Sequence, residues 1–345
     1  MVSPALWCQS IRSRCNHCLH FYTIRLISIL QKKILIPLLI VTALATGIVS
    51  ATIYEIVKPK PGNVFDETRK ETPGLKWVGD SIVLQAYPFN VEGDLYFAGE
   101  RVPLEDPDVR ERLDRELTIN AYRHSNTILN MKLANRFFPE IEKIMTEEGV
   151  PTDFKYMPLI ESDLRDVYSP AGASGFWQFV PATAKLYGLE VNDKVDERYN
   201  VERSTRAACK YLKEAKEKLG SWTAAAASYD FGIDGIAGKM QSQHTSNYYD
   251  LWITIETSRY VFRMLAMKVI FADPERAGYH LTDADLYQPF VYKTVEVDTT
   301  VNDLAAFAEQ FGLKYKELKI LNPWMRNTSM PNPNHKVYEV RILQK

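Results

Sequence analysis

The residues whose types and spacing could do chemistry lie in one stretch, 159–181, which reads LIESDLRDVYSPAGASGFWQFVP. Its acid, Glu161, ends an apolar helical run that contains Met157, Leu159 and Ile160. A carboxyl group at the end of an apolar helix loses part of its hydration, which disfavours the charged form and raises the pKa. A carboxylic acid that donates a proton near neutral pH needs such a raised pKa. The pattern therefore predicts a general acid at Glu161.

The loop after Glu161 has the composition of a ligand-binding loop. Ser169, Gly172 and Gly175 are small residues that let backbone approach a bulky ligand closely. Trp177 offers an apolar face of the kind that sugar rings need, and Gln178 offers both a donor and an acceptor. The residues alone leave a second interpretation open, in which Glu161 is a surface acid beside a helix-turn-helix loop.

Helices must position this stretch, because residues 106–275 show helical spacing and no strand alternation. Asp106 and Pro107 predict an N-cap and a first helical residue. Helix is then predicted over 120–138, from Pro139 to Gly149, in several pieces over 155–240, and over 250–272. Residues 55–105 are rich in Pro, Gly and acids and predict a linker and irregular segment. The fold class expected is mainly α.

The end of the chain has a different pattern. Val291, Thr294–Val297 and Val337–Ile342 indicate short strands, and the intervening residues 302–310 and 316–321 indicate helices. The sequence therefore predicts a small α+β unit, in the order strand, helix, helix, strand, over 290–345.

Charge is unevenly distributed along the 345 residues. The chain has 42 basic and 43 acidic residues, but residues 1–60 hold seven Lys or Arg and one acid, Glu55. The body from residue 61 onward therefore carries a net charge of -7. An acidic body argues against nonspecific nucleic-acid binding, which needs a basic surface.

The N-terminal region predicts a membrane anchor. Residues 34–54 contain no charged side chain, and a helix of that length reaches about 31 Å, enough to cross a bilayer core. Five basic residues and no acid precede it, so residues 1–33 are expected in the cytoplasm and the body outside. A cleaved signal peptide is the alternative, because small residues near position 50 could form a cleavage site.

The cysteines predict neither a disulfide nor a metal site. Cys15 and Cys18 form a CxxC pair with His17 and His20 nearby, but no second ligand pair follows at zinc-finger spacing. After the apolar run only Cys209 remains, in an Ala-rich helical stretch, where we expect a buried small apolar residue.

Four ordered blocks resemble the soluble lytic transglycosylase family, and specifically its membrane-bound type D branch. They read ESDLRDVYSPAGASGFWQFVPATAKLYGL, DERYNVERSTRAACKYLKEAKEKLG, SWTAAAASYDFGIDGI and IETSRYVFRMLAMKVIFADPERAGY. The resemblance implies a lysozyme-like helical catalytic domain over 106–280. It also implies cleavage of the MurNAc–GlcNAc β-1,4 bond of peptidoglycan without water, leaving 1,6-anhydro-MurNAc ends, with no metal or organic cofactor.

The resemblance also implies roles for single residues. Glu161 matches the single catalytic acid/base, and Ser162 follows it as a support at the helix end. Ser169, Gln178, Tyr229 and Tyr260 match cleft residues. The full set expected to bind substrate is Ser162, Ser169, Phe176, Trp177, Gln178, Tyr229, Asp230 and Tyr260, with Phe176 and Trp177 shaping the sugar subsites. Tyr187, Tyr199 and Tyr211 are expected in the core.

Two departures from the family pattern stand out. The loop between Glu161 and Ser169 is one residue shorter than usual, and Asp230 stands where the family has Asn. An ionised Asp only accepts hydrogen bonds, and its charge would raise the pKa of Glu161 further. A second carboxylate could also activate water, as in an inverting glycosidase. We predict that Asp230 does not do so.

Residues 292–323 read YKTVEVDTTVNDLAAFAEQFGLKYKELKILNP, with a strand, an acid-Thr turn, a helix and a final Leu-Asn-Pro. In this order the unit 290–345 resembles a LysM module, a fold that binds glycans containing GlcNAc. The Gly expected before Asp298 is absent, and Val340–Arg341–Ile342 replaces the usual ending. A LysM-like fold is expected, and a small packing domain that binds no glycan is the alternative.

The function expected is therefore a transglycosylase anchored in the inner membrane, with its body in the periplasm and peptidoglycan glycan strands as its partner. A catalytically inactive peptidoglycan-binding scaffold and a hydrolytic muramidase are the alternatives.

Overall fold

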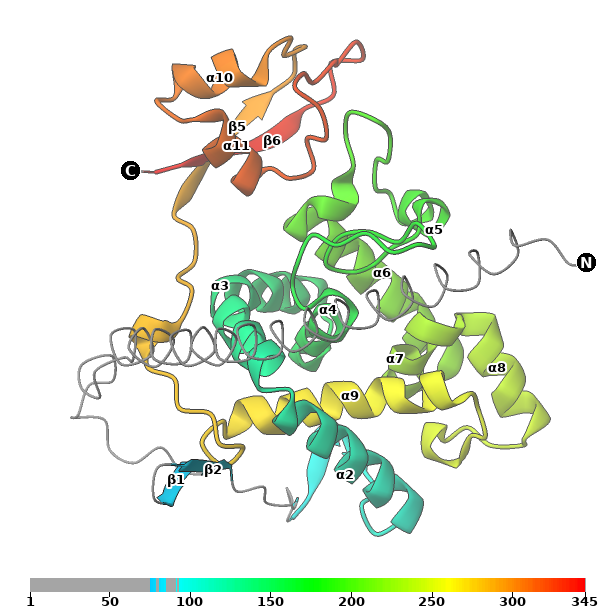
Figure 1. The fold of residues 1–345 in the computed structure, drawn as a ribbon. Coiled ribbons are helices and arrows are strands. Elements are labelled where there is room, and N and C mark those ends of the chain that lie inside the picture. Colours follow the sequence, from blue (N-terminus) through cyan, green and yellow to red (C-terminus); the bar gives the residue numbers. More distant parts are fainter. Residues whose placement is uncertain (1–74, 79–80, 85–90, 92, 345) are drawn as a thin grey trace, which may run out of the picture. The chain divides into compact units, whose positions relative to one another are not determined.

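The computed structural model describes residues 75–78, 81–84, 91 and 93–344 (Figure 1). The predicted leader 1–33, anchor 34–54 and cysteine pair Cys15 and Cys18 lie outside these residues. Within the described part of the chain, none of the helices combines the length and apolar character needed to span a bilayer.

Two short hairpins precede the helices. Strand β1 (Leu75–Val78) pairs antiparallel with β2 (Ser81–Leu84), and β3 (Leu95–Phe97) pairs antiparallel with β4 (Glu100–Val102). The second hairpin turns at Ala98 and Gly99, whose φ values are 52° and 80°, as expected of a turn that matches strand twist. Phe97 and Val102 are buried in the core of the helical body. The prediction of irregular structure is therefore wrong here, because three-residue strands are too short to show alternation.

The helical body contains eight α-helices among the described residues. They are α2 (Pro107–Tyr122), α3 (His124–Glu148), α4 (Tyr156–Ser162), α5 (Pro181–Leu186), α6 (Val201–Leu219), α7 (Trp222–Phe231), α8 (Ile233–Ser242) and α9 (Ile255–Ala272). Short 3₁₀ turns lie at η2 (Thr152–Lys155), η3 (Glu197–Tyr199), η4 (Tyr248–Asp250) and η5 (Asp283–Asp285). The mainly α prediction is confirmed.

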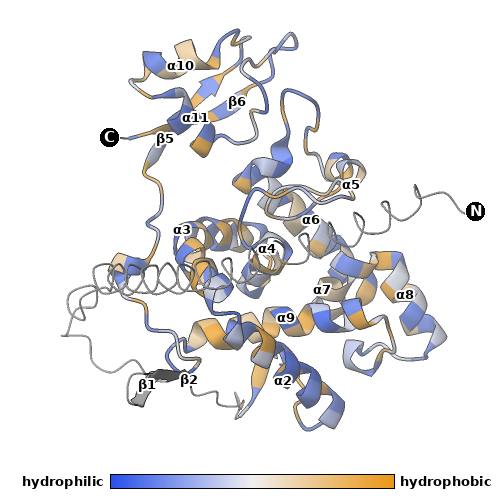
Figure 2. Ribbon diagram, in the orientation of Figure 1, coloured by the Kyte–Doolittle hydropathy of each residue, from blue (hydrophilic) through white to orange (hydrophobic). Residues whose placement is uncertain are grey.

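Helix α9 is the central support of this body. It packs against α2, α4 and α7 (Figure 1). Val261, Phe262 and Leu265 are fully buried, and Figure 2 shows apolar residues along α9 interleaved with hydrophilic ones, the pattern of a helix that buries a face. Helix α9 therefore carries its side chains into the same core that holds α4.

Some helix ends lie where the sequence predicts them and others do not. Asp106 caps α2 by accepting from the backbone N–H of Asp108, and Gly149 ends α3 in the left-handed region, as predicted. Pro139, expected to begin a helix, lies inside α3. Burial of the flanking helix face outweighs the hydrogen bond that proline cannot make. The last helix begins at Ile255 rather than 250, because Thr254 caps it.

The C-terminal unit follows the predicted order. Strand β5 (Tyr292–Val297) pairs antiparallel with β6 (Tyr338–Leu343), and α10 (Leu304–Gln310) and α11 (Tyr315–Leu321) lie between them in sequence. Leu304, Leu318 and Val340 are fully buried in a second apolar core, separate from that of the helical body. Tyr199, from η3, joins this second core.

Candidate active site

Glu161 is the second-last residue of α4, and the chain turns sharply after it. Asp163 and Leu164 both adopt left-handed conformations, each with a φ of 53°. The Asp163 carboxylate accepts hydrogen bonds from the amides of Asn126 (2.8 Å) and Asn130 (3.0 Å), both on α3. Left-handed conformations are costly for residues other than Gly and persist where surrounding contacts hold them. This turn fixes the end of α4, and with it the position of Glu161.

The carboxyl group of Glu161 is half-buried and strongly perturbed. Its pKa is raised to about 7, first by burial and then by the charge of Asp230. A hydrogen bond from Tyr260 and the charge of Arg263 oppose the rise. The Tyr260 hydroxyl donates to Oε1 of Glu161 at 2.5 Å. The raised pKa that the apolar run predicted is therefore present. Near neutral pH both protonation states are populated, so this group can donate and accept a proton.

Two tyrosines lie beside this carboxyl group and remain protonated. Tyr260, on α9, is buried, and Tyr229, on α7, is half-buried. Burial first, and then the charge of Glu161, hold the pKa of both phenols well above the ordinary value. The Tyr229 hydroxyl donates to the backbone carbonyl of Trp177 at 2.7 Å. The structure thus brings together Glu161 and Tyr260, which lie 99 residues apart in the sequence.

Ser169 and Gln178 fold the loop that follows Glu161. The Ser169 hydroxyl accepts from the backbone N–H of Ala173 at 3.0 Å. Gln178, with a φ of 48°, donates from its side-chain amide to the carbonyls of Gly175 (2.7 Å) and Val167 (3.3 Å). Both side chains are half-buried, so each has polar capacity left for a ligand.

Three residues expected to bind substrate are interior residues instead. Trp177 is fully buried, and its indole N–H donates to Thr205 at 3.0 Å. Phe176 is 4% exposed and packs edge-on against Phe137. Ser162 donates to the carbonyls of Pro158 and Phe176, both at 2.9 Å. The prediction that Phe176 and Trp177 present apolar faces to sugar is wrong. Motif spacing does not reveal which way a side chain points.

Arg198 is a positioning residue that was not among the site residues expected from the sequence. Its guanidinium makes a two-point ion pair with Asp196 and donates to the loop carbonyls of Gly172 (2.7 Å) and Phe179 (3.0 Å). A Cβ atom added at Gly175 would lie 2.0 Å from the carbonyl oxygen of Arg198. The loop therefore closes onto the backbone just before α6, and only glycine fits at that contact. The signal available in the sequence was the spacing of Asp196 and Arg198.

Asp230 is exposed and held by a short chain of hydroxyls. The buried Thr257 hydroxyl donates to Oδ2 of Asp230 at 2.7 Å and lies 2.8 Å from the Thr254 hydroxyl. A hydroxyl has one hydrogen, so Thr257 accepts from Thr254. The charge of Asp230 raises the pKa of Glu161, which is the direction expected of a like charge.

The core tyrosine prediction holds at two positions. Tyr199 and Tyr211 are buried, whereas Tyr187 is half-buried and donates to Glu214 at 2.8 Å. Cys209 is fully buried in α6, as expected.

Comparison with known families identifies two domains. Residues 139–251 match the model of the transglycosylase SLT domain. Residues 293–345 match the model of the soluble lytic transglycosylase C-terminal LysM-like domain. Glu161 lies within the first match, and the two matches follow each other in the order that the resemblance implied.

The chain is similar to parts of several known proteins. The membrane-bound lytic murein transglycosylase D of Escherichia coli K12 is 24% identical over 274 residues, which cover 76% of this chain and 58% of that protein. The chain thus spans little more than half the length of that relative. A putative tributyltin chloride resistance protein of Alteromonas sp. M-1 is 36% identical over 99 residues, 27% of this chain and 48% of that protein. The solved 70 kDa soluble lytic transglycosylase of E. coli is 15% identical, with a TM-score of 0.34 over 52% of this chain and 33% of that one.

Proposed function

We propose that this protein is a peptidoglycan lytic transglycosylase that acts in cell-wall remodelling. The observation that carries the proposal is that Glu161, with a pKa of about 7, lies within the residues that match the SLT model and accepts a hydrogen bond from Tyr260. Hydrolytic glycosidases usually need two carboxyl groups in fixed geometry. One suffices when the substrate supplies its own nucleophile.

In the proposed reaction Glu161 acts first as acid and then as base. Protonated Glu161 donates its proton to the glycosidic oxygen, and the bond between that oxygen and C1 of MurNAc breaks. The N-acetyl group of MurNAc stabilises the positive charge that develops at C1. Glu161, now ionised, takes the proton from the C6 hydroxyl as that oxygen bonds to C1. The hydroxyl is already tethered to the reacting ring, so ring closure benefits from proximity. No water is consumed.

The neighbouring residues have separate roles in this proposal. Tyr260 orients Glu161 and stabilises the ionised state that forms between the two steps, because it donates to Oε1. Ser169, Gln178 and Tyr229 contact the sugars in this proposal, since all three are half-buried rather than core residues. Ser162 supports the helix end through two hydrogen bonds to backbone carbonyls.

The proposed arrangement of the whole chain follows the sequence pattern. Residues 34–54 anchor the protein in the inner membrane, residues 1–33 remain in the cytoplasm, and the catalytic domain 106–280 and the LysM-like domain 290–345 lie in the periplasm. The name of the Escherichia coli relative, a membrane-bound enzyme, supports an envelope location. Peptidoglycan strands are the proposed partner of both domains.

Muropeptides released from purified peptidoglycan test the proposal by mass spectrometry, with the Glu161→Gln variant as control. We expect products one water lighter than hydrolytic ones from the native protein and none from the variant. Release of reducing-end products would favour the muramidase instead, with Asp230 as second carboxylate, because its charge acts on Glu161. Wall binding without release by either form would favour the inactive scaffold.

A further inference from the structure

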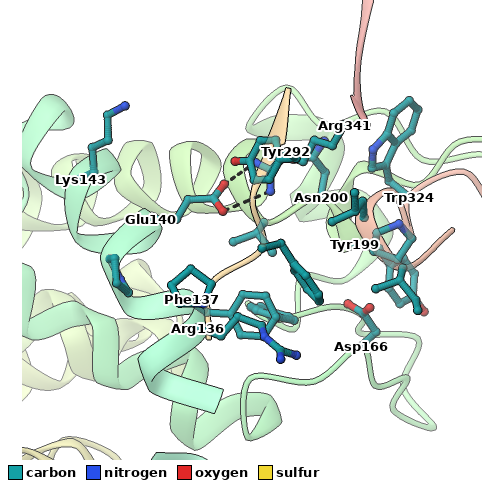
Figure 3. A pocket seen from close by; sticks show the side chains of 18 residues that line it. Arg136, Phe137, Glu140, Lys143, Asp166, Tyr199, Asn200, Tyr292, Trp324 and Arg341 are labelled. Atoms are coloured by element: carbon teal, nitrogen blue, oxygen red, sulfur yellow. Dashed lines mark hydrogen bonds and ion pairs between the residues drawn. The ribbon is translucent and has the colours of Figure 1, made fainter. Parts of the chain in front are cut away.

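A pocket whose lining does not include Glu161 lies between the helical body and the C-terminal unit (Figure 3). Its volume is 360 Å³, and small-molecule sites start at about 300 Å³. Helix α3 contributes Arg136 and Phe137, and the loop after Glu161 contributes Asp166. Phe290 lies before β5, Tyr292 is the first residue of β5, and further lining residues come from η3, α11 and β6. Separate segments of the helical body and of the C-terminal unit therefore build one concave site.

Arg136 is a half-buried cation in this wall that has no anionic partner among residues 93–344. Its guanidinium carbon lies 4.4 Å from the centre of the Phe290 ring, and its Nε–H donates to the backbone carbonyl of Gln288 at 3.0 Å. Burial lowers the pKa of Arg136, which means that the surroundings leave its positive charge under-compensated. A carboxylate in the pocket would supply the missing negative charge.

Asp166 is an acidic residue in the lining of the same pocket that also lacks an ion-pair partner among the described residues. No hydrogen bond or ion pair engages its carboxylate within the described part of the chain, and Figure 3 shows its oxygens at the pocket. The side chain is exposed, yet the surrounding protein removes enough water to raise its pKa to about 6, against the opposing charge of Arg326. An ammonium group in the pocket would favour the ionised form.

The other strong charges of the pocket are already compensated or lie at its rim. Arg341 donates to Glu140 on α3, an ion pair drawn in Figure 3. Lys143 is 77% exposed and lies near Glu147. Arg136 and Asp166 are therefore the lining cation and anion that have no ion-pair partner among residues 93–344, and Phe137 and Phe290 line the same pocket.

We propose that this pocket binds a zwitterionic diamino-acid end of a peptide. Its carboxylate pairs with Arg136, its ammonium group pairs with Asp166, and its carbon chain packs on Phe137 and Phe290. That the natural ligand belongs to the peptide part of peptidoglycan rests on the proposed function, whereas the binding itself does not. Phe176 lines the pocket, and its carbonyl accepts from Ser162. The occupied pocket therefore contacts the segment that adjoins Glu161.

Titration of the full-length protein with meso-diaminopimelic acid at pH 7.5, followed by calorimetry, tests this proposal. We expect saturable binding that weakens at least tenfold in Asp166→Asn and in Arg136→Gln. The matched control is Asp193→Asn, which removes an exposed carboxylate outside the pocket lining and should leave binding unchanged. Pimelic acid lacks the ammonium groups and cadaverine lacks the carboxylates, so both should bind at least tenfold more weakly.

Several outcomes would overturn the proposal. These are no saturable binding, binding unchanged by Asp166→Asn, equal binding of pimelic acid or cadaverine, and binding of chitotriose in place of the diamino acid. The probe has no glycosidic bond, so its binding is independent of catalysis. Binding without muropeptide release would support the pocket and refute the proposed function, and release without binding would do the reverse.

Discussion

Tyr260→Phe should shift the pH dependence of activity upward. The hydroxyl donates to Oε1 of Glu161 at 2.5 Å and lowers the pKa of that carboxyl group. A hydrogen bond to a charged group contributes about 1.5–3 kcal/mol, and one pKa unit corresponds to about 1.4 kcal/mol. Loss of the hydroxyl should therefore raise the pKa of Glu161 by about 1–2 units above its value of about 7.

The sign of the shift follows from the role of Glu161 as an acid. The first step needs protonated Glu161, so activity falls as pH rises through the pKa of this group. In Tyr260→Phe this alkaline limb should move to higher pH, while the maximal rate falls because the ionised state loses its donor. Asp230→Asn should move the limb to lower pH, because the charge of Asp230 raises the same pKa.

Initial rates of muropeptide release between pH 5 and 10 measure the position of the alkaline limb. Tyr279→Phe is the matched control, since its hydroxyl donates at 2.5 Å to the carbonyl of Ala121 rather than to Glu161. We expect no movement of the limb in that variant. A limb that stays in place or moves down in Tyr260→Phe would refute the assignment of the pKa and the hydrogen bond to catalysis.

Three further predictions concern stability, each measured by urea unfolding. Glu161→Gln should raise the free energy of unfolding by about 2–3 kcal/mol at pH 8 and by much less at pH 5. The pKa of Glu161 in the folded protein, about 7, lies above the ordinary 4.5, so the native protein loses stability as pH rises from the ordinary pKa through the folded one. An equal effect of the substitution at both pH values would contradict this reasoning. Gly175→Ala should lower the free energy of unfolding by at least about 3 kcal/mol, because the added Cβ would lie 2.0 Å from a backbone oxygen. Gly220→Ala should lower it by only about 1–2 kcal/mol, because Gly220 has a φ of 82° but open space around it. Similar losses in the two would refute the close contact. Arg198→Met should cost about 3–5 kcal/mol by leaving Asp196 buried without its partner, and a loss below 1 kcal/mol would show that the pair does not hold the loop.

The local features of the fold could be predicted because short-range chemistry determines them. Asp106 and Pro107 begin α2, and Gly149 ends α3, as capping preferences dictate. The raised pKa of Glu161 also followed from its neighbours, because an apolar run removes water from the carboxyl group.

The remaining features depend on contacts between distant parts of the chain. Tyr260 reaches Glu161 only because α9 packs against α4. Trp177 points into the core towards Thr205 rather than towards sugar, and nothing in its own motif encodes that direction. Pro139 lies within α3 because the helix is held by packing on its buried face. The spacing of residues along the sequence does not determine which helices pack together or which way these side chains point.

The central claim is that one carboxyl group cleaves the glycosidic bond without water. Digestion of peptidoglycan in ¹⁸O-labelled water, followed by mass spectrometry of the released muropeptides, tests it most directly. We predict anhydro products without label, because the C6 hydroxyl of the substrate is the nucleophile. Labelled reducing ends that disappear in Asp230→Asn would contradict the claim and establish hydrolysis with Asp230 as the second carboxylate.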